Sequence, residues 1–113
     1  MLDCIFCKIV NKEIPTDIVF ENENALVFDD IHPQAKVHMQ VIPKKHLVSV
    51  AKTKDEDKDI LADCLLACKK AAEIKNIAES GYKIITNNGE NGGQFVKHIH
   101  FHVLGGEKLK MKV

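Results

Sequence analysis

The stretch His98-Ile99-His100-Phe101-His102-Val103-Leu104 places three histidines at alternate positions, with apolar residues between them. Successive side chains of a β-strand point to opposite faces, so this two-residue period predicts a half-buried strand. The three imidazoles would stand on one face, about 6.5–7 Å apart. Ile99, Phe101 and Val103 would pack into the core behind them. A row of imidazoles suits metal binding or phosphoryl chemistry, and the spacing does not distinguish the two.

Length, charge and hydropathy predict one domain without a nucleic-acid or membrane partner. The 113 residues are enough for a single sizeable core. The 16 basic and 16 acidic residues cancel, whereas a general nucleic-acid binder carries a basic excess. No apolar run approaches the roughly 20 residues of a membrane span, and residues 1–4 do not resemble the start of a signal peptide. We therefore expect a cytoplasmic protein whose four cysteines are free or metal-bound, because the cytosol keeps thiols reduced.

The apolar periods and turn residues predict an α+β fold. We expect a short helical entry over 3–10, strands over 18–21, 25–29, 37–42 and 82–86, and a long helix from 53 to about 78. Thr53 and Glu56 fit a capping box at the start of that helix. With the histidine strand, this order predicts an antiparallel sheet of about five strands, with a short N-terminal helix and one long central helix packed on it.

The four cysteines fall into two groups, for which we expect different roles. Cys4 and Cys7 are spaced as Cys-x-x-Cys, which can chelate zinc when two further ligands are available. Possible ligands are His32, His38, His46 and the histidine row. Cys64 and Cys68 belong to an apolar stripe of the long helix, so we expect them to be small core side chains. The stripe comprises Ile60, Leu61, Cys64, Leu65, Cys68, Ala71 and Ala72.

Two polar segments near the histidine row have open roles. Residues 87–94 read Asn-Asn-Gly-Glu-Asn-Gly-Gly-Gln. They fit a hairpin connection, in which Asn and Gly supply positive φ angles, and they also fit an anion-binding nest of backbone amides. Asp29 and Asp30 follow each other at the end of an expected strand, so their side chains point apart. One of them can face a cleft and bind a sugar diol, or it can cap a turn.

The pattern His-φ-His-φ-His-φ-φ, where φ is apolar, resembles the signature of the histidine triad (HIT) superfamily of nucleotide hydrolases and transferases. The similarity covers nearly the whole chain except the central helix and the tail, and it is closer to the Hint branch than to the Fhit branch. It rests on segments 5–9, 12–15, 28–31, 33–35, 41–46 and 92–94. The resemblance implies a single HIT domain over 1–113 with a HIT-like fold. It also implies a homodimer whose helices and sheets join across a two-fold axis.

The resemblance implies a catalytic role for each histidine of the row. His100 matches a nucleophile that attacks the α-phosphorus of a purine nucleotide, forming a nucleotidyl-histidine that water cleaves. His102 matches a residue that contacts the phosphate and helps the leaving group, and His98 and His46 match supporting histidines. The implied enzyme hydrolyses nucleoside 5′-phosphoramidates or related adenylates. The alternatives are a dinucleoside polyphosphate hydrolase and a zinc-stabilised nucleotide-binding or adaptor protein with little turnover.

The resemblance further implies contacts for the nucleotide and for a zinc ion. The base would occupy an apolar slot, Asp30 would hold the ribose hydroxyls, and the glycine-rich loop would bind the phosphate. The matching residues are Ile5, Phe6, Ile9, Phe28 and Ile31 for the base, and Asn87, Gly93, Gln94 and the backbone around Phe95 for the phosphate. Microbial Hint-like members bind zinc through positions matching Cys4, Cys7, His46 and His98. Four protein ligands close the coordination sphere, so this zinc would be structural.

Two positions depart from the family pattern. Phe95 stands where the family usually has Ser or Thr, whose hydroxyl contacts the bridging phosphate atom or the leaving group. The phenyl ring cannot make that bond, so we expect a changed rate or leaving-group preference. The tail, residues 107–113, lacks the Trp-containing end with which animal Hint proteins reach the partner subunit's site. A preference for lysine-linked substrates is therefore not implied.

Overall fold

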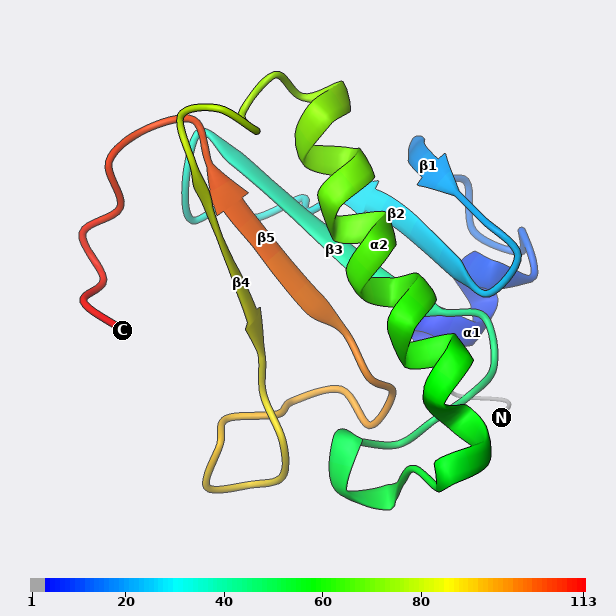
Figure 1. Ribbon diagram of the computed structural model, residues 1–113. Coiled ribbons are helices and arrows are strands. Elements are labelled where there is room, and N and C mark those ends of the chain that lie inside the picture. Colours follow the sequence, from blue (N-terminus) through cyan, green and yellow to red (C-terminus); the bar gives the residue numbers. More distant parts are fainter. Residues whose placement is uncertain (1–3) are drawn as a thin grey trace.

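The computed structural model describes residues 4–113, which form one five-stranded antiparallel sheet and two α-helices (Figure 1). The strands are β1 (Ile18–Glu21), β2 (Ala25–Asp29), β3 (Val37–Pro43), β4 (Tyr82–Thr86) and β5 (Phe101–Gly105), in the spatial order β1-β2-β3-β5-β4. The helices are α1 (Ile5–Val10) and α2 (Lys58–Ile74), and α2 is preceded by the short 3₁₀ turns η1 (Val50–Lys52) and η2 (Asp55–Asp57). The predicted α+β architecture is confirmed. No helix within residues 4–113 has the length and apolarity of a membrane span.

Helix α2 covers one face of the sheet (Figure 1). Its small side chains are buried against the strands. Cys64 and Cys68 are fully buried against the sheet, which confirms that they are core side chains. Their burial raises the pKa of both thiols to about 12, so they remain protonated. The predicted apolar stripe is wrong at Leu65, whose side chain is 50% exposed. Leu65 lies one residue, or about 100°, round the helix from Cys64 and so faces outward.

Helix α1 lies on the opposite face of the sheet, beside β2 and β3. Its buried side chains, Phe6 and Ile9, pack against Leu26, Phe28 and Ile42 in a second apolar cluster. A six-residue helix is too short to be stable alone, so these contacts and the cysteines at its start hold it in place. The site described below lies on this face.

Two predicted element boundaries are wrong for local reasons. The histidine strand was expected from residue 98, but β5 begins at Phe101 because the Ile99 N–H donates to the Leu47 carbonyl at 2.7 Å instead of joining a ladder. Helix α2 begins at Lys58 and ends at Ile74, because Asn76 takes a left-handed φ of 60°. The capping carboxylate is Asp57, which accepts from the Lys54 N–H at 2.9 Å, so the predicted Thr53–Glu56 box lies one residue too early.

Candidate active site

The three histidines of the row lie on the α1 face although only His102 belongs to the regular strand. The Phe6 ring packs with its centroid 5.7 Å from that of His98 and 5.1 Å from that of His100, and the rings of His100 and His102 are 5.2 Å apart. Ile99, Phe101 and Val103 are buried in the α2-side core, as predicted from the alternation. The row therefore forms a continuous polar strip beside α1.

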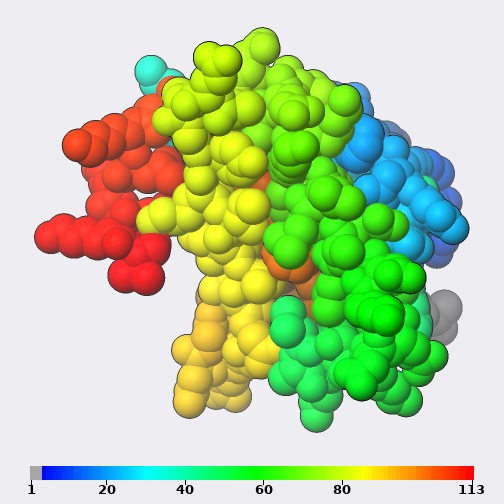
Figure 2. Space-filling view, in the orientation of Figure 1, coloured from blue at the N-terminus to red at the C-terminus, as the bar shows by residue number. Residues whose placement is uncertain are grey.

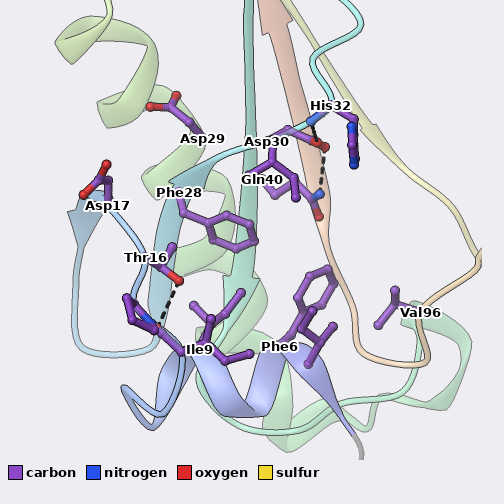
Figure 3. Close-up of a pocket in the computed structure, with 14 residues that line it drawn as sticks. Phe6, Ile9, Thr16, Asp17, Phe28, Asp29, Asp30, His32, Gln40 and Val96 are labelled. Carbon is purple, nitrogen blue, oxygen red and sulfur yellow. Dashed lines mark hydrogen bonds between the residues drawn. The ribbon is translucent and has the colours of Figure 1, made fainter.

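An open apolar cavity of about 630 Å³ adjoins this strip (Figure 3). It lies between α1 and the end of β2, where the Phe6 and Phe28 rings pack against one another at a tilt, with their centroids 5.9 Å apart. The six residues expected at the base and the ribose all line it: Ile5, Phe6, Ile9, Phe28, Asp30 and Ile31. The dimensions and lining suit a flat heterocycle with a polar group at one end.

His100 is oriented by a backbone bond. Its Nδ1 lies 2.9 Å from the His98 carbonyl oxygen, and since a carbonyl only accepts, the proton is on Nδ1. The other nitrogen, Nε2, makes no hydrogen bond to residues 4–113. It is not among the buried, unpartnered atoms of that range, which are Gln40 Oε1 and His46 Nε2. His100 therefore presents an accessible lone pair beside Phe6.

His102 is oriented by His38, a residue that the sequence suggested only as a possible metal ligand. The Gln34 N–H donates to His38 Nδ1 at 3.0 Å, which puts the His38 proton on Nε2. This Nε2–H faces His102 Nδ1 at 2.9 Å, so the proton of His102 is on Nε2. The alternation of residues 37–42 was the available signal, because it places His38 and Gln40 on the same face.

Burial lowers the pKa of three imidazoles on this face, those of His38, His98 and His102. Desolvation lowers the pKa of His102 to about 4, and the neighbouring His100 and His38 lower it further. His98 has its pKa lowered to about 4 mainly by the same effect, although its bond to the Pro43 carbonyl opposes the shift. The pKa of His38 is also lowered by burial, against the attraction of Asp30. At neutral pH these three imidazoles can therefore act through hydrogen-bond donors and lone pairs.

The side chains of Asp29 and Asp30 point in opposite directions, as their adjacent positions predicted. Asp29 pairs with Lys75 at 3.0 Å. The Asp30 carboxylate accepts from the His32 N–H through Oδ1 and from Gln40 Nε2 through Oδ2, each at 2.8 Å (Figure 3). A carboxylate has about four acceptor positions, so each oxygen retains one for a ligand.

The loop before the histidines is braced by its own side chains. Asn87 Nδ2 donates to the Gly92 carbonyl at 2.7 Å, and Gln94 Nε2 donates to the Val48 carbonyl at 2.6 Å. Gly93 has a φ of +79°, as expected for the loop. The Phe95 side chain stands 95% exposed. The loop and the η1 segment lie side by side at the lower edge of the face in Figure 2.

The loop residues contribute to a second cavity, of about 430 Å³. Gly93, Gln94 and Phe95 line it together with Lys52 and Lys97. The next residue along the chain, Val96, lines the apolar cavity instead. The loop therefore lies between the two cavities, with lysines and an aromatic ring on one side.

Cys4, Cys7, His46 and His98 form a cluster that could hold a metal ion, with one ligand atom from each within 4.8 Å of the others. The His46 and His98 Nδ1 atoms are 3.1 Å apart, and they lie 3.1 Å from Cys7 Sγ and 3.3 Å from Cys4 Sγ respectively. Tetrahedral zinc with its usual bond lengths requires ligand separations of about 3.3–3.8 Å. The His98 Nε2–H donates to the Pro43 carbonyl at 2.9 Å, a common arrangement for a zinc-bound imidazole. The residues therefore fit zinc.

A second cluster consists of Asp30, His38 and His102, and its potential ligand atoms also lie within 4.8 Å of one another. It differs from the first cluster in its hydrogen bonds. His38 Nδ1 already accepts from the Gln34 N–H, so the proton of His38 is on the nitrogen that would have to bind the metal. Coordination would displace that proton and the Gln34 bond together. The cluster is therefore a hydrogen-bond network and not a second metal site.

Comparisons with known proteins agree with the geometry. The family model described as the HIT domain matches residues 11–109. An uncharacterized HIT-like protein of Methanocaldococcus jannaschii is 43% identical over 102 residues, which are 89% of this chain and 77% of the relative. A HIT family hydrolase from Legionella pneumophila has a crystal structure with a TM-score of 0.89, 45% identity, and coverage of 94% of this chain and 95% of its own. A histidine triad protein from Clostridium difficile gives a TM-score of 0.94, with 42% identity and coverage of 100% and 98%.

Proposed function

This chain belongs to the HIT domain family, and from that premise we propose that it is a nucleotide hydrolase cleaving nucleoside 5′-phosphoramidates or related adenylates, with a preference for purines. The observation that carries the proposal is the orientation of His100. Its Nδ1–H is held by the His98 carbonyl, and its Nε2 lone pair is accessible beside the apolar cavity. An imidazole whose Nδ1–H is held by a backbone carbonyl and whose Nε2 is free, next to a heterocycle-sized cavity, is suited to attack a nucleotide's phosphorus.

The proposed reaction has two displacements. His100 Nε2 forms a bond to the α-phosphorus, and the bond from phosphorus to the leaving amine breaks as the amine takes up a proton. The Nε2–H of His102 donates to the phosphate or the leaving group, where charge changes in the transition state. Water then attacks the nucleotidyl-histidine, which restores His100 and releases a nucleoside 5′-monophosphate. The intermediate replaces one difficult displacement by two easier ones.

The nucleotide is proposed to bind across the α1 face. The base enters the apolar cavity that Phe6 and Phe28 line, and the ribose hydroxyls use the free acceptor positions of Asp30. The phosphate lies against the His102 donor and the backbone amide of Phe95. The Gly93 N–H already donates to the Glu90 carbonyl at 3.0 Å, so Gly93 contributes the turn of the loop and not a free donor. The braced loop supports this assignment because its amides are positioned before a ligand arrives.

A structural zinc ion is proposed at Cys4, Cys7, His46 and His98. When bound, it would link three parts of the chain: α1, the segment after β3, and His98, which lies two residues before the nucleophile. Purified protein should contain about one zinc per chain by elemental analysis.

We also propose a homodimer formed through α2 and the edge strand β4. Both present large exposed apolar side chains: Leu65, Leu66, Ile74 and Ile84. Within residues 4–113, strand β4 pairs with β5 on one side only, so its other edge is available for pairing. Sedimentation velocity should report a dimer for the wild type and a monomer for Leu66→Lys. A monomeric wild type would reject this assembly.

The central test is a substrate panel on the wild type and on His100→Ala. We expect an adenosine phosphoramidate to be hydrolysed by the wild type, with a nucleotidyl adduct visible by intact mass in a rapid quench. His100→Ala should lose both, with thermal melting and metal content unchanged. Retention of most activity by this variant would reject the proposed mechanism.

Dinucleoside polyphosphate hydrolysis is a second candidate, favoured by the 430 Å³ cavity beside the loop. Phe95 offers a ring on which a second base can stack, and Lys52 and Lys97 offer charge for the extra phosphates. Turnover of diadenosine polyphosphates and phosphoramidates by one preparation decides between the two.

A further inference from the structure

Gln40 lies at the centre of the α1 face, and no role proposed so far requires it. In the sheet register it pairs with Phe28 of β2 on one side and with His102 of β5 on the other. Phe28 lines the proposed base cavity and His102 is a proposed phosphate contact. If the proposed function is right, the sugar that joins base to phosphate has to lie over Gln40.

The orientation of the Gln40 amide is determined by Asp30. Gln40 Nε2 donates to Asp30 Oδ2 at 2.8 Å, and the reverse orientation would set two acceptor oxygens against each other. The Gln40 Oε1 atom is left buried with no donor from residues 4–113. An unpartnered buried acceptor is costly, so the one hydrogen bond that this amide makes, from Nε2 to the Asp30 carboxylate, has to offset that cost.

The same carboxylate competes for the single donor of His38. The His38 Nε2–H has two acceptors within reach, His102 Nδ1 at 2.9 Å and Asp30 Oδ2 at 3.4 Å. A charged acceptor is the stronger one at equal distance. The Gln40 amide already donates to Asp30 Oδ2. This bond makes Asp30 Oδ2 a weaker acceptor for the Nε2–H of His38. The shorter contact, to His102, then takes that proton.

We infer that Gln40 is a positioning residue: its bond to Asp30 keeps the Nε2–H of His38 directed at His102. This holds the proton of His102 on Nε2, where it can donate to the phosphate. It also leaves one acceptor position on each Asp30 oxygen for the two hydroxyls of a ribose. The catalytic part of the inference rests on the proposed function, whereas the tautomer of His102 does not.

The test uses Gln40→Met, which keeps the length of the side chain and removes its donor. Long-range proton–nitrogen NMR of the unliganded protein reports which ring nitrogen of each histidine is protonated. We expect Nε2–H for His102 in the wild type and a mixture of tautomers in the variant. Gln40→Glu, of nearly identical size, cannot donate to Asp30 when ionised and should give the same result. Met39→Leu, a volume-conserving change on the opposite face, is the control.

Kinetics supply the second readout. With an adenosine phosphoramidate, Gln40→Met should lower kcat by roughly ten- to a hundredfold, the usual effect of losing a hydrogen bond to a charged group. Its preference for adenosine over 2′-deoxyadenosine substrates should shrink, because Asp30 is no longer held. A variant that had lost only packing would keep the wild-type ratio of activity with adenosine substrates to activity with 2′-deoxyadenosine substrates.

The outcomes separate the two claims. An unchanged His102 tautomer in both Gln40 variants overturns the inference, whatever the activity. The expected tautomer change in a wild type that turns over no nucleotide rejects the proposed function and supports the positioning role. A tautomer change accompanied by an unchanged kcat and an unchanged sugar preference overturns the catalytic part.

Discussion

Replacing Gly92 by alanine should disable the loop that we expect to bind the phosphate. A Cβ at this position would lie 2.5 Å from the Asn88 carbonyl oxygen and 3.1 Å from the Asn88 nitrogen. Both are backbone atoms, so neither can rotate away, and the loop has to open by at least about 0.5 Å to reach 3.0 Å. The Asn88 side chain accepts from the Ala51 N–H at 2.7 Å, so the opening also strains the contact with η1.

These distances set the expected size of the effect. Overpacking of this kind costs about 1–3 kcal/mol, which corresponds to a fall in melting temperature of roughly 3–15 °C. A displacement near 1 Å in a positioning group costs up to about a hundredfold in rate. We therefore expect Gly92→Ala to fold, to melt earlier, and to lose about ten- to a hundredfold in kcat with an adenosine phosphoramidate.

Gly89→Asn is the matched control in the same loop. Gly89 has a φ of +74°, and a Cβ at this position would have no atom within 4 Å. Asparagine tolerates this conformation better than most residues, so the kcat of Gly89→Asn should stay within about threefold of the wild type. Equal loss in both variants would mean that loop flexibility, and not the backbone position at Gly92, matters. A Gly92→Ala variant with wild-type melting and turnover would refute the reasoning outright.

Three further outcomes are expected. Chelation should remove one zinc per chain and lower the melting temperature; Cys7→Ser should lack the metal and Cys64→Ser should keep it, as measured by elemental analysis. Because burial lowers the pKa of His102 to about 4, below the ordinary value of about 6.5, the unfolded chain binds the extra proton first. The free energy of unfolding should therefore fall as the pH drops from about 6.5 to 4, less steeply in His102→Asn by urea titration at several pH values. Phe95→Ser should raise turnover of a phosphoramidate relative to a diadenosine polyphosphate several-fold, with both measured on one preparation.

The parts of the structure that sequence predicted well are those governed by local pattern. The alternation of residues 98–104 placed Ile99, Phe101 and Val103 in the core, and the small residues of α2 were recognised as its buried side. Opposed directions for Asp29 and Asp30 followed from their adjacency alone. These inferences need only the period of a strand or a helix.

The parts that sequence missed depend on contacts between distant segments. His38 and His102 are 64 positions apart, and only the β3–β5 register brings their nitrogens to 2.9 Å. The role of Gln40 depends on the same register and on the direction of one amide. Strand β5 starts late because Ile99 bonds to Leu47, a contact across 52 residues that no local pattern reveals.

His98 connects the two halves of the proposed site, because its side chain and its backbone serve different partners. Its Nδ1 belongs to the cysteine cluster, and its carbonyl oxygen accepts the Nδ1–H of His100. Phe6, between the two cysteines in sequence, packs on both histidine rings and lines the base cavity. A metal ion bound there would therefore orient the nucleophile and hold the wall of the base slot at once. It follows that metal loss should weaken nucleotide binding as well as stability, although His98 is the only proposed metal ligand within two residues of the nucleophile.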